Sequence, residues 1–228
     1  MILPELGPET PGMGPDAVGF VLAGGRSTRM GQDKAMVQLA GRSLAERALG
    51  ILREAGLPAS LAGGSPAIGN LAPLVQDSVP GLGPLGGICA GLASTSARIA
   101  VFMPIDLPLL PPALIVYLLE QANVTGEAVT LASAGGYLQT FPVVLVRGVL
   151  PVLEGELQAG HRSCLAAFET AVATLSRAIR VISVETLVQS GRVAHPEGLK
   201  AESWFLNVNA PEGLELASQY LSRPHRVS

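Results

Sequence analysis

The stretch Val18–Lys34, which reads VGFVLAGGRSTRMGQDK, decides the fold and points to a ligand site. It opens with the apolar run Val18–Leu22, which has the length and sharp boundaries typical of a buried strand. Two glycines break the run, and three cations follow: Arg26, Arg29 and Lys34. Paired glycines let backbone N–H groups approach a ligand closely, and guanidinium and ammonium groups bind phosphate. The stretch therefore indicates either a polyphosphate-binding turn after a strand or an ordinary glycine turn with solvated cations.

The spacing of this loop excludes a P-loop, in which Gly-Lys is followed by Ser or Thr, because Lys34 follows Asp33 and precedes Ala35. Leu22–Lys34, LAGGRSTRMGQDK, instead resembles the signature loop of nucleotidyltransferases with a glycosyltransferase-A-like fold. It is most similar to LAGGxSxRMGxDK, the hallmark of the MobA-type molybdenum cofactor guanylyltransferases. The resemblance extends over about Val18–Leu221 and is dense at four segments. It implies a Rossmann-like nucleotidyltransferase fold.

The bulk composition limits the kinds of ligand. The 228 residues are 48% hydrophobic, enough for the core of one large α/β domain, and the net charge of −3 does not suit binding along a nucleic-acid backbone. A local basic loop in a mildly acidic chain suits a small anionic ligand. Cys89 and Cys164 match no metal spacing and are expected to be buried thiols, which indicates a reducing compartment.

The two ends and one apolar stretch decide the expected domain limits. Residues 1–16 are rich in Pro and Gly without the regions of a signal peptide, so we expect a disordered leader, one domain over 17–222 and a tail over 223–228. Residues 99–122 are apolar, but Asp106 and four prolines interrupt them, which a membrane-spanning helix tolerates badly. We expect a cytoplasmic protein without membrane or nucleic-acid partners.

Apolar runs and turn residues alternate along the whole chain. A capping box, Ser43 with Glu46, predicts the start of a helix that ends near Ala55, with Gly56 after it. We expect a short extended piece over 35–39, strands over 18–22, 59–62, 73–76, 99–103, 128–132, 141–146, 179–183 and 204–206, and further helices over 86–94, 111–121, 148–158, 163–173 and 211–221. Such alternation predicts an α/β fold with a doubly wound, mostly parallel sheet.

Several candidate ligand-binding residues directly follow predicted strands. In doubly wound sheets, ligands gather at the carboxyl ends of strands near a topological switch point. The candidates are Leu22, Ala23 and Gly24 after the first strand, with Asp77, Asp106 and Asn207 after later ones. A rival motif, GLGPLG over 81–86, is a literal GxGxxG. Four residues separate it from the preceding strand, however, and it would leave the basic loop unexplained.

Asp106, in the segment MPIDLP, is the candidate metal ligand. A carboxylate at a strand end can bind Mg²⁺ together with substrate phosphates and water, although it can equally serve as a negative charge before the next helix. The segment resembles the PxDxP metal site of the guanylyltransferases, which favours Mg²⁺ as the cofactor. The turn Asn207-Val208-Asn209 resembles the family's NxN element and would place both asparagines near the metal or the acceptor. Without that likeness, an Asn pair before a helix is more often a cap.

The resemblance implies transfer of GMP from GTP to the terminal phosphate of molybdenum-molybdopterin, with release of pyrophosphate. By the same likeness, Lys34, Arg29 and Asp106 are the expected catalytic residues. The expected nucleotide-binding residues are Leu22, Ala23, Gly24, Gly25, Lys34, Asp77 and Asp106. Arg162 resembles the Arg of a family Gly-x-Arg element at the acceptor pocket, although a surface turn there is an equal alternative. Molybdoenzymes or cofactor-delivery proteins are further possible partners.

One departure from the family pattern affects the prediction of which nucleotide base the protein selects. The family commonly has an Asn near the end of its second strand, whereas this chain has LAGGS over 61–65; Asp77 resembles the guanine-side acidic residue. The alternatives are therefore a cytidylyltransferase of the same cofactor or a sugar-phosphate nucleotidyltransferase. A more distant alternative is a non-catalytic nucleotide-sensing protein.

Overall fold

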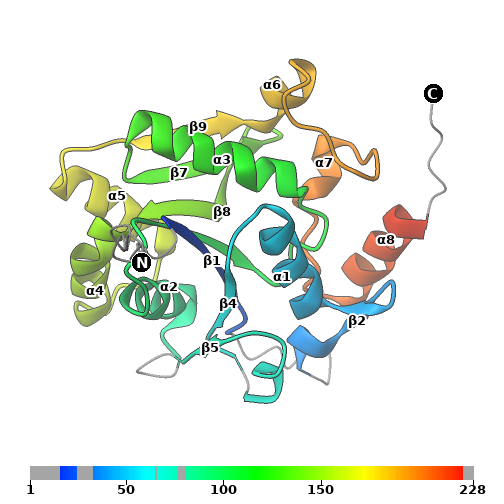
Figure 1. The fold of residues 1–228 in the computed structure, drawn as a ribbon, viewed down its shortest axis with the longest axis horizontal. Coiled ribbons are helices and arrows are strands. Elements are labelled where there is room, and N and C mark those ends of the chain that lie inside the picture. The colour runs from blue at the N-terminus through cyan, green and yellow to red at the C-terminus, as the bar shows by residue number, and fades with distance from the viewer. Residues whose placement is uncertain (1–15, 25–32, 65, 77–80, 223–228) are drawn as a thin grey trace, which may run out of the picture.

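One seven-stranded sheet with helices on both faces organises the molecule (Figure 1). The computed structural model describes residues 16–24, 33–64, 66–76 and 81–222. The sheet strands are β1 (Ala17–Leu22), β4 (Ala59–Ala62), β5 (Leu74–Val75), β6 (Ile99–Pro104), β7 (Val129–Ala134), β8 (Tyr137–Val146) and β9 (Ile179–Ser183). Their order is β5-β4-β1-β6-β8-β7-β9, and only β8 runs antiparallel to its neighbours. The predicted doubly wound, mostly parallel α/β fold is confirmed.

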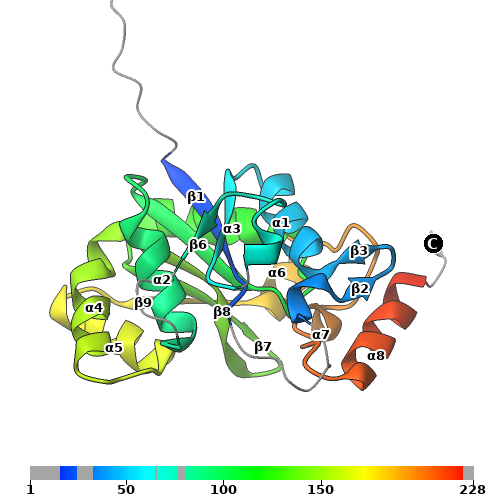
Figure 2. The same ribbon diagram turned by 90° about the horizontal axis from the view of Figure 1, so that it is seen from below.

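The helices form two layers. They are α1 (Leu44–Glu54), α2 (Gly83–Ala93), α3 (Pro112–Thr125), α4 (Leu150–Gln158), α5 (Cys164–Thr174), α6 (Val184–Gln189), α7 (Ala201–Trp204) and α8 (Pro211–Ser222), with 3₁₀ turns η2 (Lys34–Met36), η3 (Pro66–Ile68) and η4 (Arg147–Val149). Helices α1 and α3 pack on one face of the sheet, and α2, α4 and α5 cover the other (Figures 1 and 2). A small hairpin, β2 (Gln38–Leu39) and β3 (Arg42–Ser43), precedes α1.

Strand residues alternate between two cores. In β1, Val21 belongs to the core under α1 and α3, whereas Phe20 and Leu22 belong to the core under α2, α4 and α5. We call these the α1/α3 face and the α2/α5 face. Because successive strand residues point to opposite faces, a strand covered on both sides reads as a continuous apolar run. That is why Val18–Leu22 and Ile99–Met103 could be recognised from the sequence.

The structure corrects three predicted elements. Trp204–Leu206, predicted as a strand, is wrong: Trp204 ends α7, its indole N–H donates to the carbonyl oxygen of Leu199 at 2.9 Å, and no strand forms there. A three-residue apolar run has no periodicity that distinguishes a strand from a turn of helix. The extended piece predicted over 35–39 begins instead as η2, and α2 starts at Gly83 rather than at Gly86.

The chain order creates a topological switch at β1. From β1 the chain passes through α1 to β4 on one side, and after α2 it returns to β6 on the other side. The carboxyl ends of β1 and β6 therefore diverge into loops that leave in different directions, and such a point is where open α/β sheets bind ligands. Within the described ranges, the helices are all too short or too polar to cross a membrane.

Candidate active site

The loops that follow β1 and β6 are joined at the switch point by backbone hydrogen bonds. The amide of Ile105 donates to the carbonyl oxygen of Leu22 at 3.3 Å, which ties the chain after β6 to the end of β1. The amide of Val208 donates to the carbonyl oxygen of Asp106 at 2.9 Å, which brings the segment before α8 onto the same loop. Three parts of the chain that lie far apart in sequence thus meet at one edge of the sheet.

Lys34 and Asp106 contact each other directly. The ammonium Nζ of Lys34 lies 3.1 Å from Oδ2 of Asp106 and also donates to Oδ1 of Asn209. The two charged side chains are 12% and 17% exposed, so solvent screens the pair only partly. An ammonium, a carboxylate and an amide from three separate segments therefore form one polar cluster.

The position of Lys34 is set by the turn that carries it. Asp33 precedes η2, and its side chain accepts a hydrogen bond from the amide of Ala35 at 3.1 Å. Ala35 is completely buried in the α1/α3 core, as is Val37 after the turn. Because the residues on both sides of Lys34 are held by a cap and by core packing, its side chain has a fixed base from which to reach Asp106.

Asp106 keeps one carboxylate oxygen without a partner. Its Oδ1 is inaccessible to solvent and receives no hydrogen bond in the structure. A buried carboxylate oxygen that lacks a donor costs free energy, and a bound cation removes that cost. This single carboxylate matches the way Mg²⁺ is usually bound, by one or two carboxylates with substrate phosphates and water. Over the described ranges, no three His, Cys, Asp or Glu residues gather into a metal-binding group.

The start of the glycine turn lies against the next strand of the sheet. The amide of Ala23 donates to the carbonyl oxygen of Ala62 at 3.0 Å, so the turn begins in register with β4. A Cβ added to Gly64 would lie 3.0 Å from the carbonyl oxygen of Ala23, and Gly64 has a φ of +95°. This close approach leaves no space for a side chain at position 64. Position 64 therefore requires glycine.

Asn207 and Asn209 differ in their surroundings. Asn209 contacts Lys34, whereas no hydrogen bond joins the exposed side chain of Asn207 to the cluster among the described residues. The backbone carbonyl of Asn207 instead packs against α8, since a Cβ at Gly213 would lie only 2.8 Å from its oxygen. The predicted pair is thus split: one amide lies in the cluster and the other lies on its rim.

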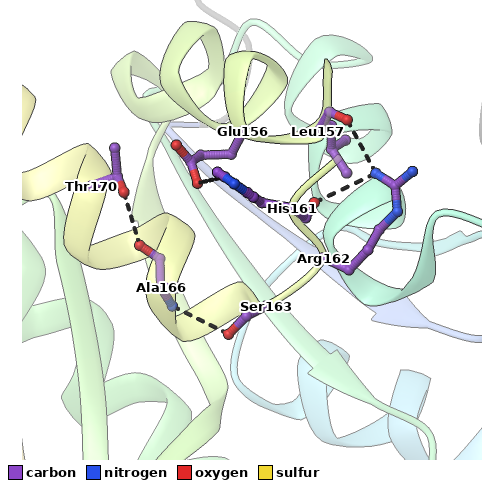
Figure 3. A network of polar contacts seen from close by, with 7 residues as sticks. All are labelled: Glu156, Leu157, His161, Arg162, Ser163, Ala166 and Thr170. Carbon is purple, nitrogen blue, oxygen red and sulfur yellow. Dashed lines mark hydrogen bonds and ion pairs between the residues drawn. The ribbon is translucent and has the colours of Figure 1, made fainter. Parts of the chain in front are cut away.

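Arg162 lies in the α4–α5 turn and not in the cluster (Figure 3). Its guanidinium donates to the carbonyl oxygens of Leu157 at 3.1 Å and His161 at 3.4 Å, while His161 contacts Glu156 at 2.8 Å. Helix α4 leads away from the amino edge of the sheet, so this turn and the start of α5 lie at the carboxyl edge, as the cluster does. Arg162 therefore shares the edge but makes no contact with Lys34 or Asp106.

Three of the expected site residues lie outside the described ranges: Gly25, Arg29 and Asp77. Their expected roles stay predictions. Sequence reasoning also missed residues that hold the site together, namely Asp33, Gly64 and Gly213. An Asp directly before the Lys of the signature is a helix-cap signal, and a glycine pair after a strand signals close backbone approach, so the first two could have been found.

Comparison with known proteins defines the class to which this fold and cluster belong. Residues 19–175 match the sequence model of the MobA-like NTP transferase domain. The chain belongs to the MobA-like NTP transferase family, as its signature loop led us to expect.

Within that family, the chain is 35% identical over 196 residues to a molybdenum cofactor guanylyltransferase of Xanthomonas euvesicatoria, an alignment that covers 85% of this chain and 90% of the relative. The fold is similar to that of molybdopterin-guanine dinucleotide biosynthesis protein A from Archaeoglobus fulgidus, with a TM-score of 0.72, 21% identity, and coverage of 90% of this chain and 98% of that one. A Mycobacterium tuberculosis protein solved in complex with manganese has a TM-score of 0.55 and 20% identity, over 74% of this chain and 88% of that chain.

Proposed function

We propose that this protein transfers GMP from GTP to the terminal phosphate of molybdenum-molybdopterin and releases pyrophosphate. The observation that carries the proposal is the contact of Lys34 with Asp106 and Asn209 at the topological switch, next to the glycine turn. Its support from relatives is the guanylyltransferase of Xanthomonas euvesicatoria, with which the chain shares most of its length. The proposed selectivity for guanine is based on that relative and on the resemblance of Asp77 to the family's guanine-side residue.

The reaction is a substitution at the α-phosphorus of GTP. An oxygen of the acceptor's terminal phosphate forms a bond to this phosphorus, and the bond to the oxygen bridging the α- and β-phosphates breaks. The electron pair of that bond leaves with pyrophosphate. Because the attacking oxygen is already anionic, the reaction requires no general base, and the protein contributes positioning and charge stabilisation.

The residues present divide this work. The backbone of Leu22, Ala23, Gly24 and Gly25, together with Arg29, would hold the triphosphate, and Asp77 would lie on the guanine side. Lys34 would offset negative charge developing around the α-phosphate. Asp106, with its unpaired Oδ1, would hold a divalent cation, for which we propose Mg²⁺. The bound ion would supply Lewis-acid stabilisation of phosphate oxygens.

The acceptor would bind next to the same cluster. Asn209 lies in the cluster, Asn207 lies on its rim, and Arg162 lies at the same edge of the sheet. We propose that all three serve the acceptor. The enzyme would act in the cytoplasm, since a chain with only two cysteines, Cys89 and Cys164, both buried, suits a reducing compartment. A molybdoenzyme or a cofactor-delivery protein would then receive the product.

A pyrophosphate-release assay with molybdenum-molybdopterin, Mg²⁺ and each of GTP, CTP, ATP and UTP tests the proposal. We expect release with GTP, and loss of release when EDTA removes the metal. Release with CTP alone would identify a cytidylyltransferase instead. Thermal stabilisation by GTP and Mg²⁺ without any release, in the presence of active acceptor, would favour a nucleotide-sensing protein.

A further inference from the structure

The β7–β8 hairpin exposes an aromatic side chain at the edge of the sheet where the cluster lies. Tyr137, at the start of β8, is 76% exposed. Strand β8 pairs with β7 at Tyr137–Gln139, and the next three residues bulge out. From Val143 onward, β8 pairs with both β6 and β7. Figure 2 shows this hairpin extending beyond the carboxyl end of β1. The outer part of β8 thus separates from β6, while β7 stays paired with β9 up to Ser133, and the tip of the hairpin projects past the switch point.

The face of the hairpin that carries Tyr137 can be read from the register. Ala132 pairs with Gln139 and Ala134 pairs with Tyr137, and both alanines belong to the α1/α3 core. Because directly opposite residues of paired strands project to the same face, Tyr137 and Gln139 also point to the α1/α3 face. The turn that carries Lys34 packs on that same core through Ala35. Tyr137 and the cluster therefore share both an edge and a face of the sheet.

The hairpin is held in place at its tip. The amide of Gly135 donates to a carboxylate oxygen of Glu185, at the start of α6, at 2.7 Å. Gly135 and Gly136 have φ values of +60° and +79°, the conformation required by a tight two-residue hairpin turn. An aromatic ring on an anchored hairpin offers contact area at little cost in conformational entropy.

The order of the strands indicates which substrate would reach this ring. The glycine turn after β1 lies against β4, so the triphosphate is expected on the β1–β4 side of Asp106, whereas β8 and β7 lie on the other side of β6. In phosphoryl transfer, the attacking and leaving oxygens lie roughly in line on opposite sides of the phosphorus. A nucleophile that enters opposite to the pyrophosphate can approach from the side of the hairpin.

We infer that the β7–β8 hairpin forms the acceptor-side wall of the site, with Tyr137 stacking on the flat fused heterocycle of the acceptor and Gln139 offering its amide to the ring edge. This inference rests on the proposed function, since it takes the acceptor to be a pterin. A polar aromatic side chain suits such a ring because a heteroaromatic system has a π-face for stacking and donors and acceptors along its edge. The side chain of Gln139 donates to the backbone carbonyl oxygen of Tyr137 at 3.3 Å, and the register places both side chains on the same face of the hairpin.

The test compares Tyr137→Ala, Tyr137→Phe and Val124→Ala with the wild type. Val124 is the matched control because it is 81% exposed but lies at the end of α3, near the opposite edge of the sheet. For Tyr137→Ala we expect the KM for molybdenum-molybdopterin to rise about ten-fold, with an unchanged KM for GTP and an unchanged melting temperature. Tyr137→Phe, which keeps the ring, and Val124→Ala should both behave like the wild type.

Binding of molybdopterin alone, measured by calorimetry, separates this inference from the proposed function. If wild type binds molybdopterin more tightly than Tyr137→Ala does, but releases no pyrophosphate, the proposed reaction is overturned and the hairpin's role stays intact. An acceptor KM and Kd for Tyr137→Ala within two-fold of wild type would overturn the inference. A dimer that dissociates in Tyr137→Ala, with both constants unchanged, would also overturn it and assign the ring to a second copy of the chain.

Discussion

At the residue scale, the ion pair of Lys34 and Asp106 contributes to the stability of the fold and also lies at the proposed catalytic site. Each charge is mostly withdrawn from water and is compensated by the other. Removal of one partner leaves a partly buried charge without compensation, which costs more than loss of an exposed ion pair. The pair also lies where a triphosphate and a metal would need a cation and a carboxylate. Substitutions here are therefore expected to lower both the activity and the stability of the protein.

Lys34→Ala is expected to lower the rate of pyrophosphate release by about a hundred-fold or more, because a preorganised positive charge near the reacting phosphate is lost. Initial rates at saturating GTP and acceptor measure this effect. Lys200→Ala is the matched control, since Lys200 is the other lysine of the chain and is exposed before α7. Near-normal turnover in Lys34→Ala would remove Lys34 from the mechanism.

A second residue-scale prediction concerns Thr130 in β7. Its side chain is completely buried, and its hydroxyl oxygen has no hydrogen-bond partner. Thr130→Val replaces this hydroxyl by a methyl group of similar size, so we expect the free energy of unfolding to rise by about 1 kcal/mol. Urea unfolding measures the change. Thr130→Ser, which keeps the hydroxyl and removes the methyl, should instead be less stable than wild type; a destabilised Thr130→Val would show that the hydroxyl is satisfied.

At the scale of elements, the capping box of α1 fixes the helix that follows η2 and the β2–β3 hairpin. The hydroxyl of Ser43 accepts from the amide of Glu46 at 3.2 Å, and the carboxylate of Glu46 accepts from the amide of Ser43 at 2.7 Å. The hydroxyl of Ser43 also donates to the carboxylate of Glu46 at 2.7 Å. This bond first, and the bond from the amide of Ser43 second, hold the pKa of Glu46 below its usual value. The start of α1 is therefore sensitive to acid.

The sign of this acid effect follows from the direction of the pKa. Because the folded-state pKa of Glu46 is lowered from 4.5, its contribution to stability is present above about pH 4.5 and is lost as the pH falls through the folded-state pKa. Ser43→Ala should cost about 1 kcal/mol at neutral pH and less in acid. Unfolding curves from pH 7 to pH 3 measure both effects.

Ser163→Ala is the matched control for the acid effect. Ser163 caps α5 by accepting from the amide of Ala166, so no carboxylate lies at the corresponding position. Ser163→Ala should destabilise the chain by the same amount at pH 7 and pH 3, because its cap does not involve Glu46. An equal cost of Ser43→Ala at pH 7 and pH 3 would contradict the coupling between the cap and the carboxylate.

At the scale of the whole molecule, we propose that residues 17–222 form one domain. All seven strands of the main sheet belong to one hydrogen-bonded array, and the segments that meet at the cluster come from both ends of the described chain. Trp204, the single tryptophan, is 1% exposed and lies in the C-terminal part of the α1/α3 core. Its fluorescence therefore reports on a part of the core far in sequence from β1.

We expect the midpoints of urea unfolding measured by Trp204 fluorescence and by far-ultraviolet circular dichroism to coincide, because a single domain unfolds in one transition. GTP with Mg²⁺ at about one hundred times its Kd should move both curves together, by about 2.7 kcal/mol. Trp204→Phe, followed by circular dichroism alone, checks that the probe does not alter the transition. Two separated midpoints would indicate that the C-terminal segment unfolds independently.

The sequence by itself determined the elements that carry local signals. Val18–Leu22 and Ile99–Met103 were predicted because strands buried on both faces need continuous apolar runs, and α1 because a capping box marks its start. The strand ends also indicated Asp106 as a site residue, and the resemblance of the loop after the first strand to the family signature indicated Lys34. Predictions of short elements with weak periodicity were less secure. The strand predicted over Trp204–Leu206 was wrong, because burial of the indole in the α1/α3 core depends on residues that are distant in the sequence.

Only the tertiary structure decided how the site is assembled. The contact of Asn209 with Lys34, the amide of Val208 on Asp106 and the close approach of Gly213 to Asn207 all join segments whose spacing in the sequence carries no signal. The face on which Tyr137 lies depends on a bulge between β7 and β8, which shifts the register without altering the hydrophobic pattern. Local chemistry specifies which residues can act, and packing specifies which of them meet.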